Sequence, residues 1–289
     1  MDEFLFLSLP PMAIASLAAI ACVLPGNFLL LSRRAMLGDA MSHVVLPGIV
    51  AAFLLTGSGS GVVMGAGALA AAGLSALLIE FVTRRAGMEP GAAMAVVFTT
   101  MFALGVVLLE TTGTSGVHLD VEHALYGNLE SLIWLGEAPP ELLRLALIAG
   151  GLALALRLVW RPLVLATFDP VFAQTQGIRV GVIRAGLTAA TALAAVAAFQ
   201  AVGSILTIAM LICPAASARL LTRTLPAQLA ASLGFAVASA LLGYILAGYA
   251  PLWAGLPFTL SASGMIATVS GLMLAGSALI ASHRARAAL

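Results

Sequence analysis

Two ionisable side chains, Asp39 and His43, stand four residues apart in a segment that is otherwise almost entirely apolar. In an α-helix this spacing places both residues on one face. If Arg33 marks the edge of a lipid bilayer, a rise of roughly 1.5 Å per residue puts His43 about 15 Å deep, near the middle of a hydrocarbon layer of roughly 30 Å. A carboxylate at that depth should face the protein interior or a water-filled path. The pair therefore offers ligands for a divalent transition metal, or a proton relay.

Plainer interpretations of the same residues remain open. Asp39 and His43 could form a hydrogen bond that locks two helices together, or could be an ordinary interfacial pair. Pro47 follows His43 by four residues, so its ring would clash with the His43 carbonyl in a regular helix. The resulting kink could aim that carbonyl at a pathway, or could be an ordinary kink of a membrane helix.

A second group of candidate ligands lies in the sequence HLDVEH, which contains His118, Asp120, Glu122 and His123. These side chains could attract cations to the entrance of a pathway. They could equally be the solvated charges of a loop. The two cysteines, Cys22 and Cys213, lie in apolar segments and fit no metal-binding or redox spacing, so we interpret them as small core residues.

A third candidate is the segment from Phe168 to Gly177, FDPVFAQTQG. Asp169 is a suitable N-cap, Pro170 suits the first helical position and Gly177 suits the end of a helix. We expect a helix of two turns that presents Phe168 and Phe172, four residues apart, on the cytoplasmic side. Such a helix could fit a groove on a partner protein, or its phenylalanines could dip into lipid.

The composition indicates that these candidate residues belong to a membrane protein. Hydrophobic residues make up 62% of the 289 residues and charged residues 9%, against roughly 45–50% and about 25% in soluble domains. A soluble fold would need far more polar surface, so a soluble enzyme, a secreted disulfide scaffold and a nucleic-acid-binding protein are excluded. We expect one transmembrane domain over residues 1–289.

Apolar windows predict an all-α, polytopic helical bundle of eight or nine spans. Asp2 and Glu3 precede the first window without a basic region, which favours a retained first span over a cleaved signal peptide. The junction near Ala201–Gly203 is the least distinct. The predicted spans are 10–31, 33–57, 61–82, 91–109, 141–160, 181–201, 202–222, 226–248 and 259–281.

The basic residues predict the orientation of these spans. All 13 are arginine, and with an external N-terminus every one except Arg144 falls on the same side. By the positive-inside rule that side, including the C-terminus, is cytoplasmic. Because there is no lysine, the chain cannot contain a P-loop, so ATP hydrolysis would require a separate subunit.

Five segments carry a resemblance to a known family, and they occur in order along the chain. They are GDAMSHVVLPG at 38–48, LYGNLE at 125–130, FDPVFAQTQG at 168–177, VGSILTIAMLICPAASARLLT at 202–222 and SASGMIATVSGLMLAG at 261–276. With them the chain resembles the permease subunits of the zinc, manganese and iron ABC transporter family (ABC-3 type). Cys213 departs from the aliphatic residue that the family more often has there, and eight spans is the commoner number.

The resemblance implies a fold like that of type II ABC importers, and a chain that is not itself an enzyme. It implies a bacterial inner-membrane permease, paired with a second permease copy or a paralogue, two cytoplasmic ATPase subunits and an extracytoplasmic metal-binding protein. Asp39 and His43 would then coordinate a transported zinc or manganese ion, with iron also compatible and no permanently bound cofactor. Residues 168–177 would be the helix that couples the permease to its ATPase.

Two other functions are compatible with the residues alone. A secondary or proton-coupled cation transporter could use Asp39 and His43 as a relay, and would need no ATPase. A purely structural membrane subunit would tolerate size-matched substitution of both residues. If the two residues are metal ligands, the imidazole must be neutral, so uptake should fall when acid protonates it.

Overall fold

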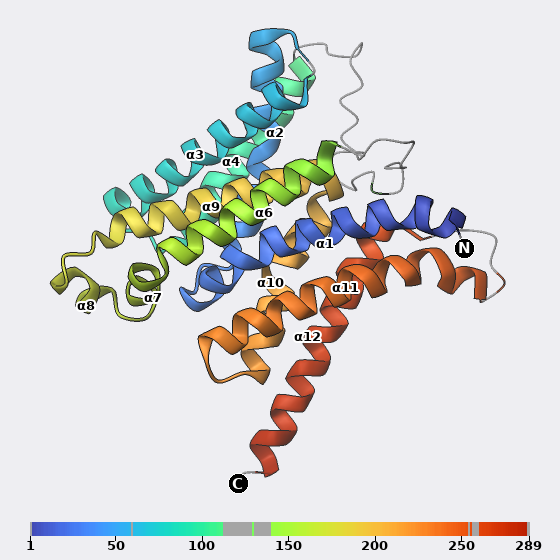
Figure 1. The fold of residues 1–289 in the computed structure, drawn as a ribbon. Coiled ribbons are helices and arrows are strands. Elements are labelled where there is room, and N and C mark those ends of the chain that lie inside the picture. The colour runs from blue at the N-terminus through green and yellow to red at the C-terminus, as the bar shows by residue number, and fades with distance from the viewer. Residues whose placement is uncertain are drawn as a thin grey trace.

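The computed structural model describes residues 2–58, 60–111, 129, 140–253, 255 and 260–287, and within these ranges every long element is a helix. The chain runs through the elements labelled in Figure 1. They are α1 (Asp2–Leu31), α2 (Met36–Thr56), α3 (Gly61–Ala86), α4 (Pro90–Thr111), α6 (Pro140–Leu158), α7 (Trp160–Phe168), α8 (Pro170–Thr175), α9 (Val180–Val202), α10 (Ser204–Leu221), α11 (Leu225–Trp253) and α12 (Ala262–Ala287).

The described helices confirm the predicted helical membrane fold. Seven of them, α1, α3, α4, α9, α10, α11 and α12, are each long and apolar enough to cross a membrane. Helices α6 and α7 make an eighth span if the bent pair is taken as one. The remaining predicted span, 33–57, corresponds to α2, whose apolar part is the shorter stretch Val44–Thr56.

The fifth predicted span, 141–160, needs a correction, because the chain bends by 74° between α6 and α7. The bend has a local cause in Pro162, which has no backbone N–H to give to Leu158 and whose ring would clash with the Leu158 carbonyl. In α7 the same proline falls in the first turn, where a missing N–H is tolerated. Trp160 anchors the start of α7 by an edge-to-face contact with Phe28 of α1, with ring centroids 5.9 Å apart.

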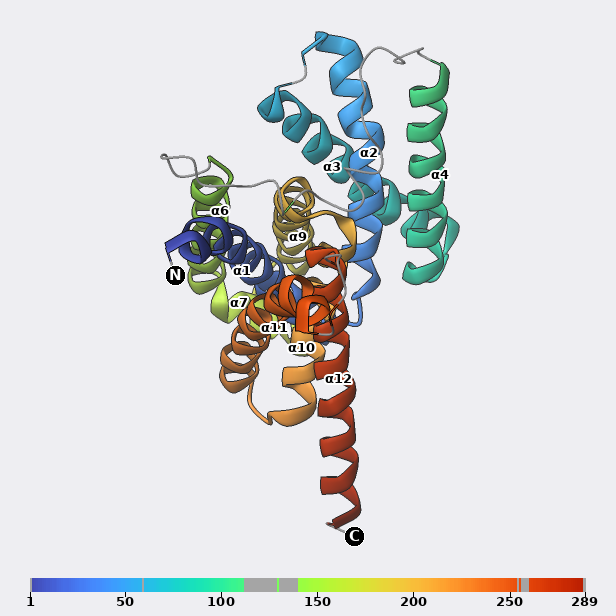
Figure 2. The ribbon, with the colours of Figure 1, turned by 90° about the vertical axis from the view of Figure 1, so that its right-hand side faces the viewer.

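Helix α1 lies at the centre of the bundle and is the most deeply buried of the candidate spans. It packs against α6, α9, α10 and α11, and α12 in turn packs on α10 and α11. Figures 1 and 2 show α2, α3 and α4 as a group at one side of the molecule, and show α12 extending away from the bundle toward the C-terminus. The short helix α8 lies at the periphery, far from the N-terminus.

Close backbone approaches hold the α2–α3–α4 group together. Gly48 of α2 and Gly67 of α3 face one another so closely that a Cβ atom on either would collide with the other's carbonyl. Small residues thus let α2 and α3 pack tightly, as is usual for helices in lipid. Gly73 of α3, in contrast, has no neighbour within 4 Å of the position of a Cβ atom.

The predicted junction between spans six and seven is also confirmed. Gly203 has a φ of +85°, a backbone conformation that glycine adopts without strain, and it separates α9 from α10. Its carbonyl accepts hydrogen bonds from the backbone N–H and the side-chain hydroxyl of Thr207. The two apolar windows that meet there are therefore two helices.

Candidate functional site

Helix α2 carries both Asp39 and His43, and it is continuous from Met36 to Thr56. The two residues are therefore one helical turn apart, as the spacing predicts. The placement of their side chains lies outside the described residues. The structure does describe the neighbouring residues of α2 and the helices that pack against them.

The residues that flank Asp39 and His43 along α2 are buried. Ala40, Met41 and Val44 are at most 2% exposed. Gly38 lies against α10, where an added Cβ atom would be 2.7 Å from Cδ1 of Leu211. This part of α2 thus runs inside the protein, which is where an intramembrane carboxylate is least costly.

Pro47 follows His43 by four residues and remains inside the helix. Its ring packs against Gly105 of α4, where an added Cβ atom would be 2.9 Å from Cδ of Pro47. This contact fixes α4 beside α2 one turn beyond His43.

The remaining candidate ligands are not brought together by the part of the chain that the structure describes. Within that part, no three His, Cys, Asp or Glu side chains could share a metal ion. His118, Asp120, Glu122 and His123 lie outside the described residues. One chain would thus supply two ligands from α2, and a complete site would need more from elsewhere.

The segment 168–177 forms the predicted short helix. The carboxylate Oδ1 of Asp169 accepts a hydrogen bond of 2.9 Å from the backbone N–H of Phe172, and Pro170 is the first residue of α8. At the other end Gly177 has a φ of +76°, and the N–H of Ile178 donates to the carbonyl of Ala173. These are the N-cap and the glycine stop that the sequence predicts.

The expected arrangement of the two phenylalanines needs a correction. Phe168 is the last residue of α7 and Phe172 belongs to α8, so they do not share a helix. The reason is Asp169 itself, because an N-cap residue must leave the helical conformation, and its φ of −140° does so. Both aromatic rings are nevertheless exposed, Phe168 by 56% and Phe172 by 50%.

Sequence reasoning missed two contacts between helices. One is Gly105, which contacts Pro47 and has no signal of its own among many small residues. The other is a buried amide pair: Gln228 of α11 donates a hydrogen bond of 3.0 Å to Oδ1 of Asn27 in α1. Both amides are only 1% exposed. Buried amides in predicted spans are a signal that could have found this pair.

The architecture defines a multi-pass helical membrane protein, and comparison with known proteins gives its family. A model of the ABC 3 transport family matches residues 2–279. The manganese transport system membrane protein MntD of Bacillus subtilis is 37% identical over 270 residues, covering 91% of this chain and 88% of that protein. The manganese transport system membrane protein MntC of Halalkalibacterium halodurans is 38% identical over 253 residues, covering 88% and 82%.

The fold has a solved counterpart. The structure of PsaBC from Streptococcus pneumoniae in complex with Fab matches with a TM-score of 0.78 at 24% identity, covering 96% of this chain and 93% of that one. At this identity the match shows the fold alone. The family match and the curated relatives show that the chain belongs to the ABC 3 transport family, as a membrane permease subunit.

Proposed function

We propose that this permease imports a divalent transition metal ion, manganese or zinc, and that Asp39 and His43 coordinate the ion in transit. The observation that carries this proposal is the continuity of α2, which holds a carboxylate and an imidazole one turn apart in a segment whose described neighbours are buried. Both are ligands for manganese and zinc. Several curated relatives are named as manganese transport proteins, and others as zinc or iron transport proteins, which supports the same substrate class.

Two ligands from one chain do not complete a metal site, so we infer that a second permease copy or a paralogue supplies two more. A two-fold axis beside α2 would gather two carboxylates and two imidazoles around one ion. Such a site needs no resident cofactor, because the metal is the cargo. It would open alternately to either side of the membrane as the two permeases move.

We further infer that ATP is hydrolysed by a separate ATPase subunit, which binds to the permease at α8. The absence of lysine from the chain supports this, because no P-loop can form. The exposure of Phe168 and Phe172 at the periphery of the bundle offers that subunit an apolar surface. An extracytoplasmic metal-binding protein would deliver the ion to the opposite face, near residues 110–141, where HLDVEH could attract it.

The location follows from the same argument. The bacterial relatives support a bacterial inner membrane, and the arginine distribution supports an N-terminus outside and a C-terminus in the cytoplasm. Arg284 and Arg286 close the last turn of α12. On this topology α8 faces the cytoplasm, where the ATPase would be.

The test is uptake of radioactive manganese, zinc and iron, in competition, by cells that carry the complete transporter. Asp39→Ala and His43→Ala should each abolish uptake of the preferred metal at unchanged protein level. The matched controls are Glu89→Ala and His283→Ala, which remove an exposed carboxylate and an exposed imidazole elsewhere. Normal uptake in the Asp39 and His43 variants would place the ligands elsewhere.

Co-purification tests the ATPase partner separately. The variant Phe168→Ala/Phe172→Ala should lose its ATPase while still reaching the membrane. Phe81→Ala is the control, since Phe81 is 60% exposed but belongs to α3 and not to α7 or α8. An ATPase that stays bound to the double variant would refute docking on α8, and uptake without any ATPase would favour the secondary transporter.

A further inference from the structure

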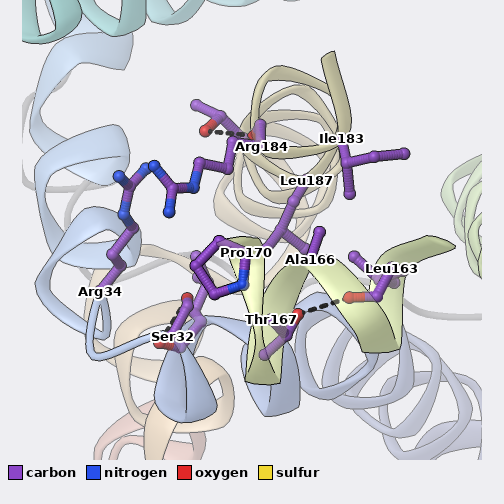
Figure 3. A pocket seen from close by; sticks show the side chains of 11 residues that line it. Ser32, Arg34, Leu163, Ala166, Thr167, Pro170, Ile183, Arg184 and Leu187 are labelled. Carbon is purple, nitrogen blue, oxygen red and sulfur yellow. Dashed lines mark hydrogen bonds between the residues drawn. The ribbon is translucent and has the colours of Figure 1, made fainter. Parts of the chain in front are cut away.

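A small pocket lies where the ends of α1, α7 and α9 meet, next to the start of α8 (Figure 3). Its volume is about 80 Å³, enough for several waters or one phosphate group. Its described lining includes two guanidinium groups and no carboxylate. The residues that line it are Leu29, Ser32, Arg34, Leu163, Ala166, Thr167, Pro170, Ile183, Arg184, Leu187 and Thr188.

The two arginines come from distant parts of the chain and face each other. Arg34 lies in the turn between α1 and α2, and Arg184 lies near the start of α9. Figure 3 shows their guanidinium groups extending toward one another. Burial and the Arg184 charge lower the pKa of Arg34, and the charge of Glu80 acts in the opposite direction. Two like charges are thus held together at one rim of the pocket.

The helix that carries Arg184 adds to the positive potential. The first turn of α9 begins at Val180, and the N-terminal end of a helix carries a partial positive charge. A cation at that end is unfavourable, whereas an anion is stabilised there. The arrangement of charges therefore favours an anion at this rim.

The hydroxyl groups of the pocket are arranged to accept hydrogen bonds. Ser32 donates its hydroxyl hydrogen to the Phe28 carbonyl at 2.7 Å, and Thr167 donates to the Leu163 carbonyl at 2.7 Å. With their hydrogens engaged, these oxygens offer only lone pairs to a ligand. A ligand that carries hydroxyl donors beside its anionic group would match both features.

The rest of the pocket wall is apolar, through Leu29, Leu163 and Leu187. A pocket with guanidinium groups at its rim and leucines along its wall suits an amphiphile better than a free ion. It also lies at the ends of three apolar helices, the level at which phospholipid head groups meet a membrane protein. Basic pockets between helices at the cytoplasmic surface bind anionic lipid head groups.

We propose that the pocket between Arg34 and Arg184 binds the head group of an anionic phospholipid that carries hydroxyls, with phosphatidylglycerol as the probe. The phosphate lies between the two guanidinium groups, which bind phosphate oxygens in bidentate fashion. The glycerol hydroxyls of the head group donate to Ser32 and Thr167. The bound lipid joins the α1–α2 turn to α9 beside the start of α8.

The test uses the purified full-length permease in nanodiscs of phosphatidylcholine mixed with phosphatidylglycerol, followed by exchange into detergent and counting of retained lipid by native mass spectrometry. Wild type should retain phosphatidylglycerol selectively. Arg34→Gln/Arg184→Gln should reduce retention about tenfold or more, as expected for loss of a charge-assisted contact. Arg34→Lys/Arg184→Lys, which preserves the charges that orient the chain, should retain less than wild type because lysine lacks the bidentate fork.

The matched control is Arg179→Gln, an exposed arginine next to α9 that does not line the pocket. It should retain lipid as wild type does. Equal retention in all four proteins would overturn the proposal.

Two further outcomes would assign the pocket to something else. Thermal stabilisation of the detergent-solubilised protein by inorganic phosphate, equal to that by short-chain phosphatidylglycerol and lost in the Gln variant, would identify a free-phosphate site and refute the lipid. If Arg34→Gln/Arg184→Gln retains lipid as wild type does but loses the co-purifying ATPase, the pocket is occupied by an acidic side chain of that partner. This outcome would also refute the lipid proposal. Neither readout depends on metal transport, so the proposed function and this inference fail separately.

Discussion

Gly105 of α4 packs directly against the ring of Pro47 in α2, with both the ring nitrogen and Cδ of the proline 2.9 Å from the position of a Cβ atom on Gly105. Pro47 is one turn beyond His43, so this contact sets the distance between α4 and the part of α2 that carries the candidate ligands. A rigid ring cannot move aside as the end of a flexible side chain can. The contact therefore explains why the position on α4 is a glycine.

The first prediction concerns this contact. Gly105→Ala should destabilise the protein by about 1–3 kcal/mol, because added volume against a rigid neighbour forces the helices apart. The measurement is thermal unfolding in detergent, together with metal uptake. Gly73→Ala is the control: its Cβ atom meets nothing within 4 Å, so it should stabilise α3 by about 0.5–1 kcal/mol. A loss of stability equal in both variants would mean that the Pro47 contact is not the cause.

The second prediction concerns the buried amides that join α1 to α11. Asn27 donates to Ser232 Oγ at 2.8 Å and accepts from Gln228 at 3.0 Å. Asn27→Leu should cost about 1–3 kcal/mol, because the amide hydrogens of Gln228 lose their buried acceptor.

A double-mutant cycle separates this coupling from general packing. Asn27→Leu/Gln228→Leu should be less destabilised than the sum of the single variants, since no stranded amide remains. Additive effects would show that the hydrogen bond between the two amides contributes little. The measurement is again thermal unfolding in detergent.

Much of the fold could be predicted because apolar length is nearly sufficient to locate a membrane helix. The predicted span 181–201 corresponds to Val180–Val202, and Gly203 ends it as expected. The predicted span 141–160 ends close to the bend at Val159, but apolar length did not indicate that a second helix, α7, follows there at an angle. Only the effect of Pro162 on the preceding turn of the helix marks the break.

Contacts between helices were much harder to predict. In lipid no polar face shows which side of a helix is buried, and small residues are found both at tight contacts and on open surfaces. Gly67 and Gly73 looked equivalent in the sequence, yet only Gly67 lies at a crossing. The meeting of Arg34 with Arg184 depends on which helices are neighbours, and neither residue had a local signal.

The cap of α8 gives the third prediction. Asp169→Ala should remove the hydrogen bond to the Phe172 N–H and cost about 0.5–2 kcal/mol, whereas Asp169→Asn should cost much less because asparagine also caps helices. The effect should appear as faster amide hydrogen exchange in residues 171–176 and as weaker retention of the ATPase. If the alanine and asparagine variants exchange equally fast, the cap does not maintain α8.

The fourth prediction comes from the turn that ends α1. Arg33 has a φ of +58°, and the N–H of Arg34 donates to the carbonyl of Leu29 at 2.8 Å while the N–H of Arg33 donates to that of Leu30 at 3.1 Å. This is the Schellman arrangement, in which glycine is the usual residue at the left-handed position. A residue with a Cβ atom at this position costs roughly 1–2 kcal/mol of stability. Replacing it by glycine removes that cost, but about half of the gain is lost because glycine raises the entropy of the unfolded chain.

Arg33→Gly should therefore stabilise the protein by about 0.5–1 kcal/mol, measured as a higher midpoint of thermal unfolding in detergent. Arg33 is exposed, so little packing is lost with its side chain. Arg33→Ala is the matched control, because it removes the guanidinium group but keeps the Cβ atom, and it should bring no gain. If alanine stabilises the protein as much as glycine does, the gain comes from removing a positive charge beside Arg34, and the backbone conformation of Arg33 is not strained.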